Sequence, residues 1–399
     1  MSNKKSFAER QKEMKAAIAA INKKEGETVI GNINNEQIAE KLRIEFIPTP
    51  SMKLNNAIGG GIPKGKFTLV SGEKDSGKTM LLLETMAKSI IENPEFVGAW
   101  FESEDSLENT SIEMFGITEK EQKERFIFMK TGTIPAESVL DYVIRMAQAG
   151  IDMIVINSLK CLTPDKELKD DMGDANIAIQ ARLNAKFMRK IIPVIADSGT
   201  ALCIVQHLAT DIGVMYGDNK TITGGLAIQY NNMLTMQLRK ASILNTHPLY
   251  HVKDRYMAIK AKITKNHCIP TKNPYVTIEY AVEIGKGIDV TQEILDVVFS
   301  NGIIDKAGAW IREYNADGPQ EKGNERILPD GTKAAWNGMA RFVEYVNNNP
   351  DYFEYLRERV EGKFVAESLS DEEIAELQEQ NNLEQQQLQE LEDMIGEVE

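Results

Sequence analysis

The sequence predicts an α/β fold in which helices cover both faces of a mainly parallel sheet. Short apolar segments of strand length alternate with longer segments of helical periodicity between residues 67 and 205. Strands that are buried on both faces read as continuous apolar runs, and helices connect parallel neighbours. Hydrophobic residues make up 42% of the 399 residues and charged residues 27%, proportions that are ordinary for a globular protein.

The expected elements follow one another in a regular order. Strands are expected at residues 67–71, 97–101, 153–156 and 202–205, and helices at 80–91, 136–149 and 177–190. Residues 4–23 predict an amphipathic helix, which a short β-like stretch follows at 28–30. This element is too small to bury a core, so we expect it to pack on something else, such as a neighbouring subunit. β-branched and aromatic residues at 257–280 predict additional edge strands.

The segment after the first strand is the strongest chemical signal. It matches the phosphate-loop pattern GxxxxGK[ST] in full, through Gly72, Glu73, Lys74, Asp75, Ser76, Gly77, Lys78 and Thr79. Glycines let the backbone fold tightly around phosphate oxygens, and the following helix presents its amino terminus to the same negative charge. Lys78 is expected to reach the β- and γ-phosphates, and the Thr79 hydroxyl to bind Mg²⁺. The sequence therefore predicts a site for ATP and Mg²⁺.

An ATPase also needs a polar group beside the metal and a group that orients or deprotonates the attacking water. The strand at 153–156 ends at Asn157, which can hydrogen-bond a metal-bound water but brings no charge. On charge alone, an aspartate there is expected to raise Mg²⁺ affinity or ATP turnover. Glu102 and Glu104 follow the strand at 97–101, and Glu104 lies further towards the edge where ligands bind. A solvated surface is the alternative interpretation for both acids.

The cysteines and the length of the apolar stretches indicate the cellular compartment of the protein. Cys161, Cys203 and Cys268 lie far apart in apolar surroundings, and we interpret them as buried small hydrophobic residues in a reducing compartment. No apolar stretch approaches the roughly 20 residues that a membrane-spanning helix needs, and residues 1–15 lack the apolar core of an export signal. We therefore expect a cytoplasmic protein without a membrane partner.

Negative charge is concentrated at the carboxyl end. Residues 366–399 are rich in Gln, contain no Lys or Arg and carry twelve acidic residues, so all but −2 of the net charge of −14 lies there. The expected state is a solvated tail that is disordered or partly helical. Such a polyanion could also compete with DNA for basic surface on the rest of the protein.

Further segments, taken in order, resemble the RecA family of ATP-dependent DNA strand-exchange proteins. They are 100–104 (WFESE), Ser158 with 162–164 (LTP), 172–174 (MGD), 181–182 (AR), 212–217 (IGVMYG), 223–225 (TGG), 265–266 (KN) and 306–310 (KAGAW). The resemblance runs from about residue 15 to about residue 345. The stretch 212–225 is the most specific part, because a generic ATPase has no reason to carry it.

Carried over position by position, the resemblance implies roles for individual residues. Glu104 would activate the attacking water, and His207 stands where the family has a glutamine that senses the γ-phosphate. Residues 165–176 and 208–223 would form two mobile loops that line a DNA channel. The implied DNA contacts are Met172, Gly173, Asn176, Ile177, Arg182, Arg189, Ile212, Gly213, Tyr216, Gly224 and Gly225. The implied contacts to a neighbouring subunit's nucleotide are Gln229, Lys265 and His267.

The resemblance also implies partners. They are single-stranded DNA, homologous double-stranded DNA, further copies of the chain in a helical filament, and single-strand-binding and loader proteins. The amino-terminal helix and β-like stretch would pack on the adjacent subunit, which gives this small element a partner.

Several positions depart from the family pattern. Asn157 replaces an acidic metal-side residue, His207 a glutamine and Ser111 an adenine-stacking tyrosine, while Gln229 and His267 replace lysines. Some bacteriophage members resemble this chain in the histidine, so a virus-encoded protein acting in infected host cytoplasm is compatible with the pattern. Phosphate binding is still expected, whereas the rate of hydrolysis and the coupling between subunits do not follow from the resemblance.

Motifs and resemblance together divide the chain into four parts. These are an N-terminal oligomerisation element at 1–45, a RecA-like ATPase core with DNA-binding loops at 46–284, a small C-terminal α/β domain at 285–365 and the tail at 366–399. Trp310 and Trp336 are expected to anchor the core of the small domain.

Three functions remain open at this point. The first is a DNA-dependent ATPase that forms filaments on single-stranded DNA and exchanges strands with a homologous duplex. The second is an ATP-bound DNA-binding filament that hydrolyses ATP slowly or not at all, which Asn157 favours. The third is a hexameric helicase with the same core, against which the N-terminal element and the stretch 212–225 both argue.

Overall fold

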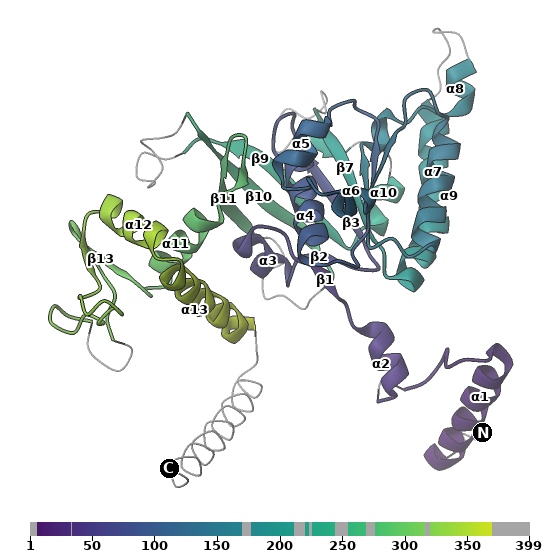
Figure 1. Ribbon diagram of the computed structural model, residues 1–399. Coiled ribbons are helices and arrows are strands. Elements are labelled where there is room, and N and C mark those ends of the chain that lie inside the picture. Colours follow the sequence, from purple (N-terminus) through teal and green to yellow (C-terminus); the bar gives the residue numbers. More distant parts are fainter. Residues whose placement is uncertain are drawn as a thin grey trace.

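The computed structural model describes residues 6–32, 34–169, 177–210, 220–222, 226–243, 254–268, 276–315 and 320–368. Its main body is a large sheet to which these residues contribute ten strands, with helices on both faces (Figure 1). The strand order is β12-β11-β10-β9-β3-β7-β6-β4-β5, and β8 pairs with β7. The bounds are β3 Phe67–Gly72, β4 Gly98–Glu102, β5 Phe126–Lys130, β6 Met153–Asn157, β7 Ala201–Thr210, β8 Lys220–Ile222, β9 Leu234–Ala241, β10 Tyr256–Asn266, β11 Thr277–Glu283 and β12 Gly287–Ile288.

The centre of this sheet is parallel, as the sequence predicts. β9, β3, β7, β6, β4 and β5 are parallel neighbours, whereas β9 to β12 pair antiparallel and extend one edge. The four predicted central strands and the additional edge strands are therefore confirmed. β7 is longer than expected because its last residues, 208–210, form a hairpin with β8. β5 is a strand that the sequence analysis did not single out.

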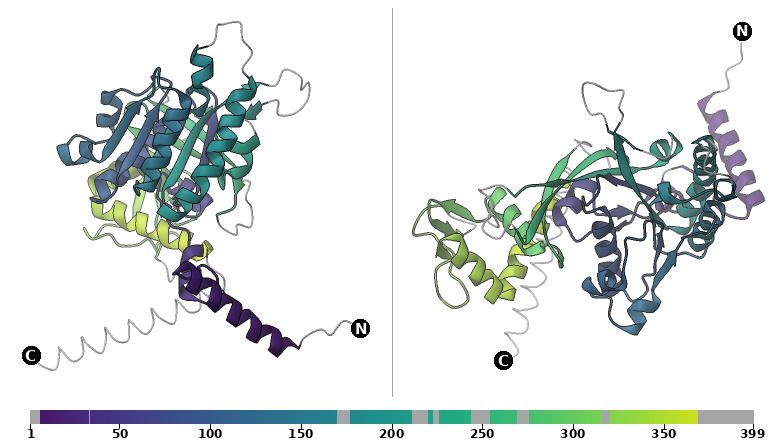
Figure 2. Two further views of the ribbon diagram at one scale, coloured as in Figure 1. Left: turned by 90° about the vertical axis from the view of Figure 1, so that its right-hand side faces the viewer. Right: turned by 90° about the horizontal axis from the view of Figure 1, so that it is seen from above.

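Two apolar cores lie on the two faces of the sheet. The helices that cover these faces can be followed in Figure 2. Strand side chains alternate between the faces, so Trp100 of β4 joins one core and its neighbour Phe101 joins the other. The Trp100 side is covered by α3 (Met52–Ile58), α4 (Lys78–Glu92), α5 (Asn109–Met114) and α6 (Lys120–Glu124). The Phe101 side is covered by α7 (Ala136–Gln148), α9 (Ile177–Ser198) and α10 (Leu226–Asn231). β1 (Phe46–Ile47) and β2 (Ile62–Pro63) form a separate small pair.

A smaller α/β unit follows the sheet and has its own core. It contains α11 (Val290–Ser300), β13 (Asp305–Ala307), β14 (Trp310–Arg312), β15 (Ala335–Asn337), α12 (Met339–Asn348) and α13 (Pro350–Ser368). Trp336 is buried in this core, as expected. Trp310 is not: it is 42% exposed and lies beside the guanidinium of Arg312, so the expectation that it anchors the core is wrong. Its strand is short and antiparallel, and alternation turns Ile311 inward instead.

The amino-terminal segment forms an arm that stands away from the core (Figures 1 and 2). It consists of α1 (Phe7–Glu25) and α2 (Glu36–Leu42), and α1 begins with a capping box between Ser6 and Glu9. None of the residues of α1 is buried. The expected β-like stretch at 28–30 is not a strand in this chain; the Asn22 amide instead bonds the backbone of Val29 and Ile30. The helix α1 of the arm thus differs from long core helices such as α4 and α7 in burying none of its residues.

Two boundaries differ in detail from those drawn on sequence. β12 ends at Ile288 and still pairs with β11 of the main sheet, so the small unit begins with α11. α13 continues to Ser368, three residues into the segment that was assigned to the tail, and the rest of that segment lies outside the described residues. Within the described part of the chain, no helix combines the length and the apolar character needed to cross a bilayer.

Glu84 connects the helix of the phosphate loop to β12, the last strand before the small unit. Its two carboxylate oxygens accept the Ile288 backbone N–H at 3.1 Å each, and a Cβ on Gly287 would lie only 2.6–2.8 Å from the carboxylate. Burial raises the pKa of Glu84 to about 7, although the bond from Ile288 and the charge of Lys88 oppose the shift. The folded chain therefore holds a proton here that the unfolded chain releases.

We predict that this proton makes the protein less stable as the pH rises. Because the pKa of Glu84 is about 7 when folded and 4.5 in the reference state, its contribution is complete below pH 4.5 and is lost as the pH rises through 7. The difference corresponds to at most about 3 kcal/mol in the free energy of unfolding. Denaturant titrations of the full chain between pH 5 and 8 should show this slope, and Glu84→Gln should flatten it. The exposed Glu92→Gln on the same helix is the control; equal slopes in both variants would contradict the prediction.

Candidate nucleotide-binding and hydrolytic site

The ends of four parallel strands bring the predicted site residues to one edge of the sheet. Gly72 at the end of β3 pairs in register with His207 on β7, and Asn157 at the end of β6 pairs with Glu102 on β4. Strand alternation places all four on the face that α4 covers. The carboxyl edge of a parallel sheet is where α/β proteins bind ligands.

The phosphate loop connects β3 to α4 in a conformation that only a few residue types tolerate. Asp75 and Gly77 have φ of 58° and 86°, in the left-handed region. A Cβ on Gly72 would lie 2.4 Å from both the Leu238 carbonyl oxygen and Ser76 Oγ. No side chain caps the amino terminus of α4, so its first N–H groups remain available for an anion. This is the geometry expected of a phosphate cradle.

The side chains of the loop also fit a bound nucleotide. Lys78 is buried and its Nζ donates to the Glu73 carbonyl oxygen at 2.6 Å. Burial lowers the pKa of Lys78, while the charges of Glu104 and Asp75 partly restore it. Ser76 Oγ is buried and has no hydrogen-bond partner among the residues that the structure describes, and a buried hydroxyl of this kind calls for an acceptor or donor from a ligand. Thr79 is half-buried beside them, as a magnesium ligand would be.

A second buried polar atom lies at the metal-side position. Asn157 is fully buried, and its Nδ2 donates to Glu102 Oε2 at 2.9 Å and to Ser106 Oγ at 3.2 Å. Its Oδ1 has no partner among the described residues. An amide oxygen can accept from a metal-bound water or contact Mg²⁺ itself, since Mg²⁺ takes oxygen ligands. Asn157 and Thr79 therefore fit a magnesium site, which the Mg²⁺ of a bound nucleotide would occupy.

Glu104 and His207 form a direct contact in the site. His207 Nε2 lies 2.9 Å from Glu104 Oε1 and 3.1 Å from Oε2. Partial burial alone would raise the pKa of Glu104, but hydrogen bonds from Ser158 and His207 and the charges of His207 and Lys78 hold it below its usual value. Glu104 is therefore ionised at neutral pH, as an acceptor of a proton from water must be.

The sequence singled out Glu102 and Cys161 but did not predict how either one lies in this site. Glu102 is 1% exposed and accepts hydrogen bonds from Trp100, Asn157 and the turn that carries Glu104. Cys161 is exposed, with Sγ 3.9 Å from Glu104 Oε1, so its interpretation as a buried residue is wrong. It lies in a short 3-10 turn directly after β6, where the chain turns at the ligand edge. Cys203 is buried as expected and Cys268 is half-buried.

The residues implied at a subunit interface lie at the opposite edge of the sheet. Lys265 pairs in register with Thr235 near the start of β9, and its Nζ donates to the carbonyl oxygens of Gln229 and Tyr230 at 3.4 and 3.1 Å. Burial lowers the pKa of Lys265. His267 follows on the same edge and is exposed. These residues cannot reach the phosphate loop of their own chain, because β9 runs parallel to β3 and Leu234 pairs with Thr68, far from Gly72.

The implied DNA-binding residues are described only in part. Arg182 and Arg189 are exposed on α9, two helical turns and about 10 Å apart along its axis. Ile177 begins the same helix, but its side chain is not described. Met172, Gly173, Asn176, Ile212, Gly213, Tyr216, Gly224 and Gly225 lie outside the described residues. The described residues next to the two implied DNA loops are α8 (Asp165–Lys169), which follows β6, and the paired ends of β7 and β8. Both lie at the ligand edge of the sheet.

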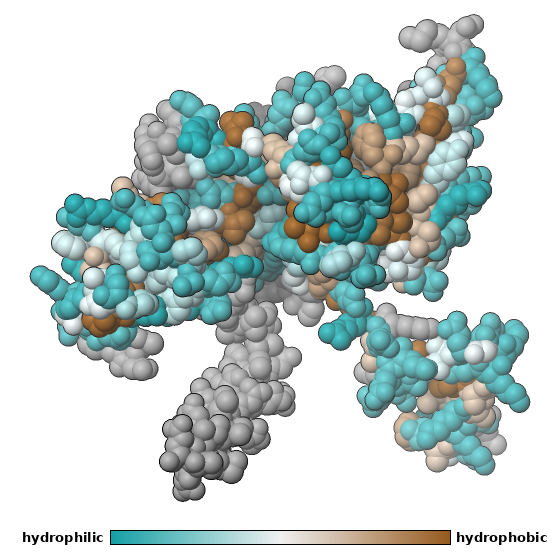
Figure 3. Space-filling view, in the orientation of Figure 1, coloured by the Kyte–Doolittle hydropathy of each residue, from teal (hydrophilic) through white to brown (hydrophobic). Residues whose placement is uncertain are grey.

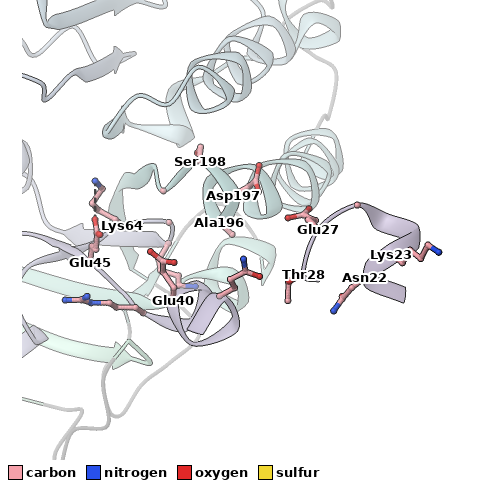
Figure 4. A pocket seen from close by; sticks show the side chains of 16 residues that line it. Asn22, Lys23, Glu27, Thr28, Glu40, Glu45, Lys64, Ala196, Asp197 and Ser198 are labelled. Atoms are coloured by element: carbon pink, nitrogen blue, oxygen red, sulfur yellow. Dashed lines mark ion pairs between the residues drawn. The ribbon is translucent and has the colours of Figure 1, made fainter. Parts of the chain in front are cut away.

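A large cleft lies away from this site. It measures about 1190 Å³ and lies between the arm and the core, lined by charged and polar groups such as Glu27, Glu40, Lys64 and Asp197 (Figure 4). Lys64 precedes β3 and Asp197 precedes β7, so the cleft is at the edge opposite Gly72. This cleft is the open space between the projecting arm and the core, and we do not interpret it as a ligand-binding pocket.

Fold and site together define a phosphate-loop nucleotide-binding protein with a RecA-like core. Comparison with known proteins narrows this class. The RecA N-terminal domain matches residues 12–289. Protein RecA of Gloeobacter violaceus is 31% identical over 324 residues, 80% of this chain and 82% of that protein. The RecA protein of Thermus aquaticus is 28% identical, over 88% of this chain and 94% of its own length. The RecA protein of Arthrospira platensis is also 28% identical, over 90% of this chain and 89% of its own length. The chain belongs to the RecA family.

We predict that Gly72→Ala abolishes nucleotide binding. The new methyl group would meet the Leu238 carbonyl and Ser76 Oγ at 2.4 Å, so the loop must shift and open the cradle. Titration with a fluorescent ATP analogue in Mg²⁺ should show at least about a hundredfold loss of affinity, since several phosphate contacts are lost together. Gly150→Ala is the control, because a Cβ there meets no atom and its positive φ affects stability alone. Normal affinity in the Gly72 variant would mean that the nucleotide binds elsewhere.

Proposed function

We propose that the chain is an ATP-dependent recombinase that forms filaments on single-stranded DNA and catalyses homologous pairing and strand exchange, with DNA-stimulated ATP hydrolysis. The contact between Glu104 and His207 carries the proposal. It joins the proposed water-activating residue to the strand that continues into the second proposed DNA loop. Binding of DNA and hydrolysis of ATP can therefore be coupled through one contact, because His207 lies on the strand that leads to the proposed DNA loop and Glu104 lies in the proposed hydrolytic site.

In the proposed reaction, the chain's own residues bind, orient and accept a proton. The N–H groups at the start of α4 and Lys78 would hold the phosphates, and Thr79 and Asn157 would hold Mg²⁺. Bound Mg²⁺ would neutralise charge on the β- and γ-phosphate oxygens. Glu104 accepts a proton from the water whose oxygen bonds to the γ-phosphorus, and the bond to ADP breaks. His207 holds Glu104 in the described state and would turn to the γ-phosphate when ATP is bound.

Filament formation is supported by surfaces that one chain leaves open. Phe7, Met14 and Ile21 recur every seven residues on one side of α1 and are 68%, 51% and 41% exposed. At the far edge of the sheet, Phe128 of β5 is 43% exposed beside an apolar groove of about 280 Å³. Figure 3 shows apolar surface on the arm and on the front of the core. An unpaired edge strand readily pairs with another chain, and the β-branched 28–30 segment of a second copy is a suitable partner.

One observation favours a related function in which the filament hydrolyses ATP slowly or not at all. Asn157 is neutral and buried, so the residue at the metal-side position itself brings no charge. An ATP-bound filament with little hydrolysis is therefore the second candidate. We further propose that the acidic tail restrains loading onto DNA by competing for basic surface.

The proposal predicts ATP hydrolysis that single-stranded DNA stimulates. Lys78→Ala should remove nucleotide binding, whereas Glu104→Gln should retain binding and lower the hydrolysis rate by about 10² to 10⁴-fold, the usual contribution of a general base. The exposed Glu95→Gln is a control for the charge change. A rate of ATP hydrolysis that is the same with and without single-stranded DNA would contradict the recombinase proposal. Binding of both ATP and DNA without turnover would favour the second candidate.

Replacing the apolar stripe of α1 should separate assembly from nucleotide binding. With Phe7, Met14 and Ile21 changed to Ser, we expect the filaments seen by electron microscopy on single-stranded DNA to be lost, because each subunit contact loses three apolar side chains. Affinity for ATP should be unchanged, since none of these residues contacts the core. Lys15→Ser on the same helix is the matched control. Filaments of normal length in the triple variant would show that the arm does not mediate assembly.

A further inference from the structure

Glu102 is a carboxylate buried inside the site that no role in the proposed reaction has used. It is 1% exposed and accepts five hydrogen bonds, which is near the capacity of its two oxygens. A buried charge is costly unless it is fully hydrogen-bonded, so this arrangement is maintained by its surroundings. Its two oxygens face different parts of the site.

One oxygen fixes the orientation of Asn157. Glu102 Oε2 accepts from Trp100 Nε1 at 2.8 Å and from Asn157 Nδ2 at 2.9 Å. Since a carboxylate only accepts, the amide group that faces it must be the NH₂ group. Ser106 Oγ accepts from the same Nδ2 at 3.2 Å, which strengthens the assignment. Asn157 Oδ1 is therefore turned to the other side, where it remains without a partner among the described residues.

The other oxygen holds the turn that carries Glu104. Glu102 Oε1 accepts from the backbone N–H of Glu104 at 3.0 Å, and from the N–H and Oγ of Ser106 at 3.3 and 3.2 Å. Asp105, between them, has a φ of 56°, a conformation that non-glycine residues rarely adopt without support. The carboxylate thus stabilises the turn that presents the Glu104 side chain to His207.

We propose that Glu102 is a positioning residue that sets both halves of the hydrolytic site, aiming Asn157 Oδ1 at Mg²⁺ and holding Glu104 in place for water. This inference rests on the proposed function and deepens it. The negative charge that Asn157 lacks is present one strand away, on its register partner. Glu102 and Asn157 form a complementary pair that carries one charge in total.

The pair also explains why an aspartate does not fit at 157. Asn157→Asp would place two carboxylates 2.9 Å apart in a buried site, and like charges at this distance cannot both ionise. Charge alone predicts that this substitution improves Mg²⁺ binding, whereas the geometry predicts the reverse. Glu102→Gln is also unfavourable: in either orientation its NH₂ group faces donors, either those of Trp100 and Asn157 or those of Glu104 and Ser106.

The test is a reciprocal exchange in the full chain. Affinity for a fluorescent ATP analogue is measured with Mg²⁺ and with EDTA for wild type, Glu102→Gln, Asn157→Asp and the double variant. We expect each single change to reduce the Mg²⁺-dependent gain in affinity about tenfold. The double variant should recover part of it, because the glutamine NH₂ group can donate to the new carboxylate, although it still faces the N–H donor of Trp100.

A second readout does not depend on nucleotide. The Trp100 indole N–H resonance in a ¹⁵N spectrum, assigned with Trp100→Phe, reports the bond to Glu102 and should move in Glu102→Gln. Glu293→Gln is the matched control, because Glu293 is equally buried but bonds Ser51 and Met52 at the domain junction. Glu293→Gln should lower the stability of the protein, but it should leave the Mg²⁺-dependent gain in nucleotide affinity and the Trp100 resonance unchanged.

The outcomes separate this inference from the proposed function. A wild-type protein that binds nucleotide equally well in Mg²⁺ and EDTA would contradict the proposed function and the metal half of this inference together. Mg²⁺-dependent binding in the wild type with an unchanged gain in Glu102→Gln would overturn the inference alone. So would tighter Mg²⁺ binding in Asn157→Asp. Recovery in the double variant supports it, even if one single variant folds poorly.

Discussion

In the centre of the sheet, β3 pairs with β7, β7 with β6 and β6 with β4, all parallel, and the proposed site depends on this pairing. The register sets Gly72 beside His207 and Asn157 beside Glu102, so residues up to 135 positions apart in sequence meet at one edge. Alternation along each strand turns these residues to the face of α4, whose amino terminus receives the phosphates. A slip of one residue in any strand would turn its functional side chain into the opposite core.

Within that frame, polar groups are held by hydrogen bonds rather than by an excess of charge. Glu102 is saturated with donors, Asn157 is oriented by it, and Glu104 is kept ionised by Ser158, His207 and Lys78. Ser76 Oγ and Asn157 Oδ1 have no hydrogen-bond partner among the described residues, and both would face a ligand. A site in which Glu102 and Asn157 already hold each other in this way is preorganised.

Connections beyond the site suggest how one chain communicates with its surroundings. Glu84 joins α4 to β12, the strand that precedes the small unit, so the nucleotide-binding helix contacts the chain directly before that unit. At the opposite edge, Lys265 and Gln229 are turned away from their own phosphate loop. The arm buries none of the residues of α1, and the groove beside β5 remains open. These features are understandable in a subunit whose neighbours complete its surfaces.

The sequence by itself determined the phosphate loop, the mainly parallel sheet and the family, because these depend on local patterns: a fixed spacing of glycines, apolar runs of strand length and helical periodicity. It also placed Glu104 and His207 in one site through resemblance. Only the tertiary structure showed that Glu102 orients Asn157, that Cys161 is exposed beside Glu104 and that Trp310 lies outside the small core. Each of these depends on which strands are neighbours and in what register, and residues distant in sequence carry no local signal of the partners they will meet.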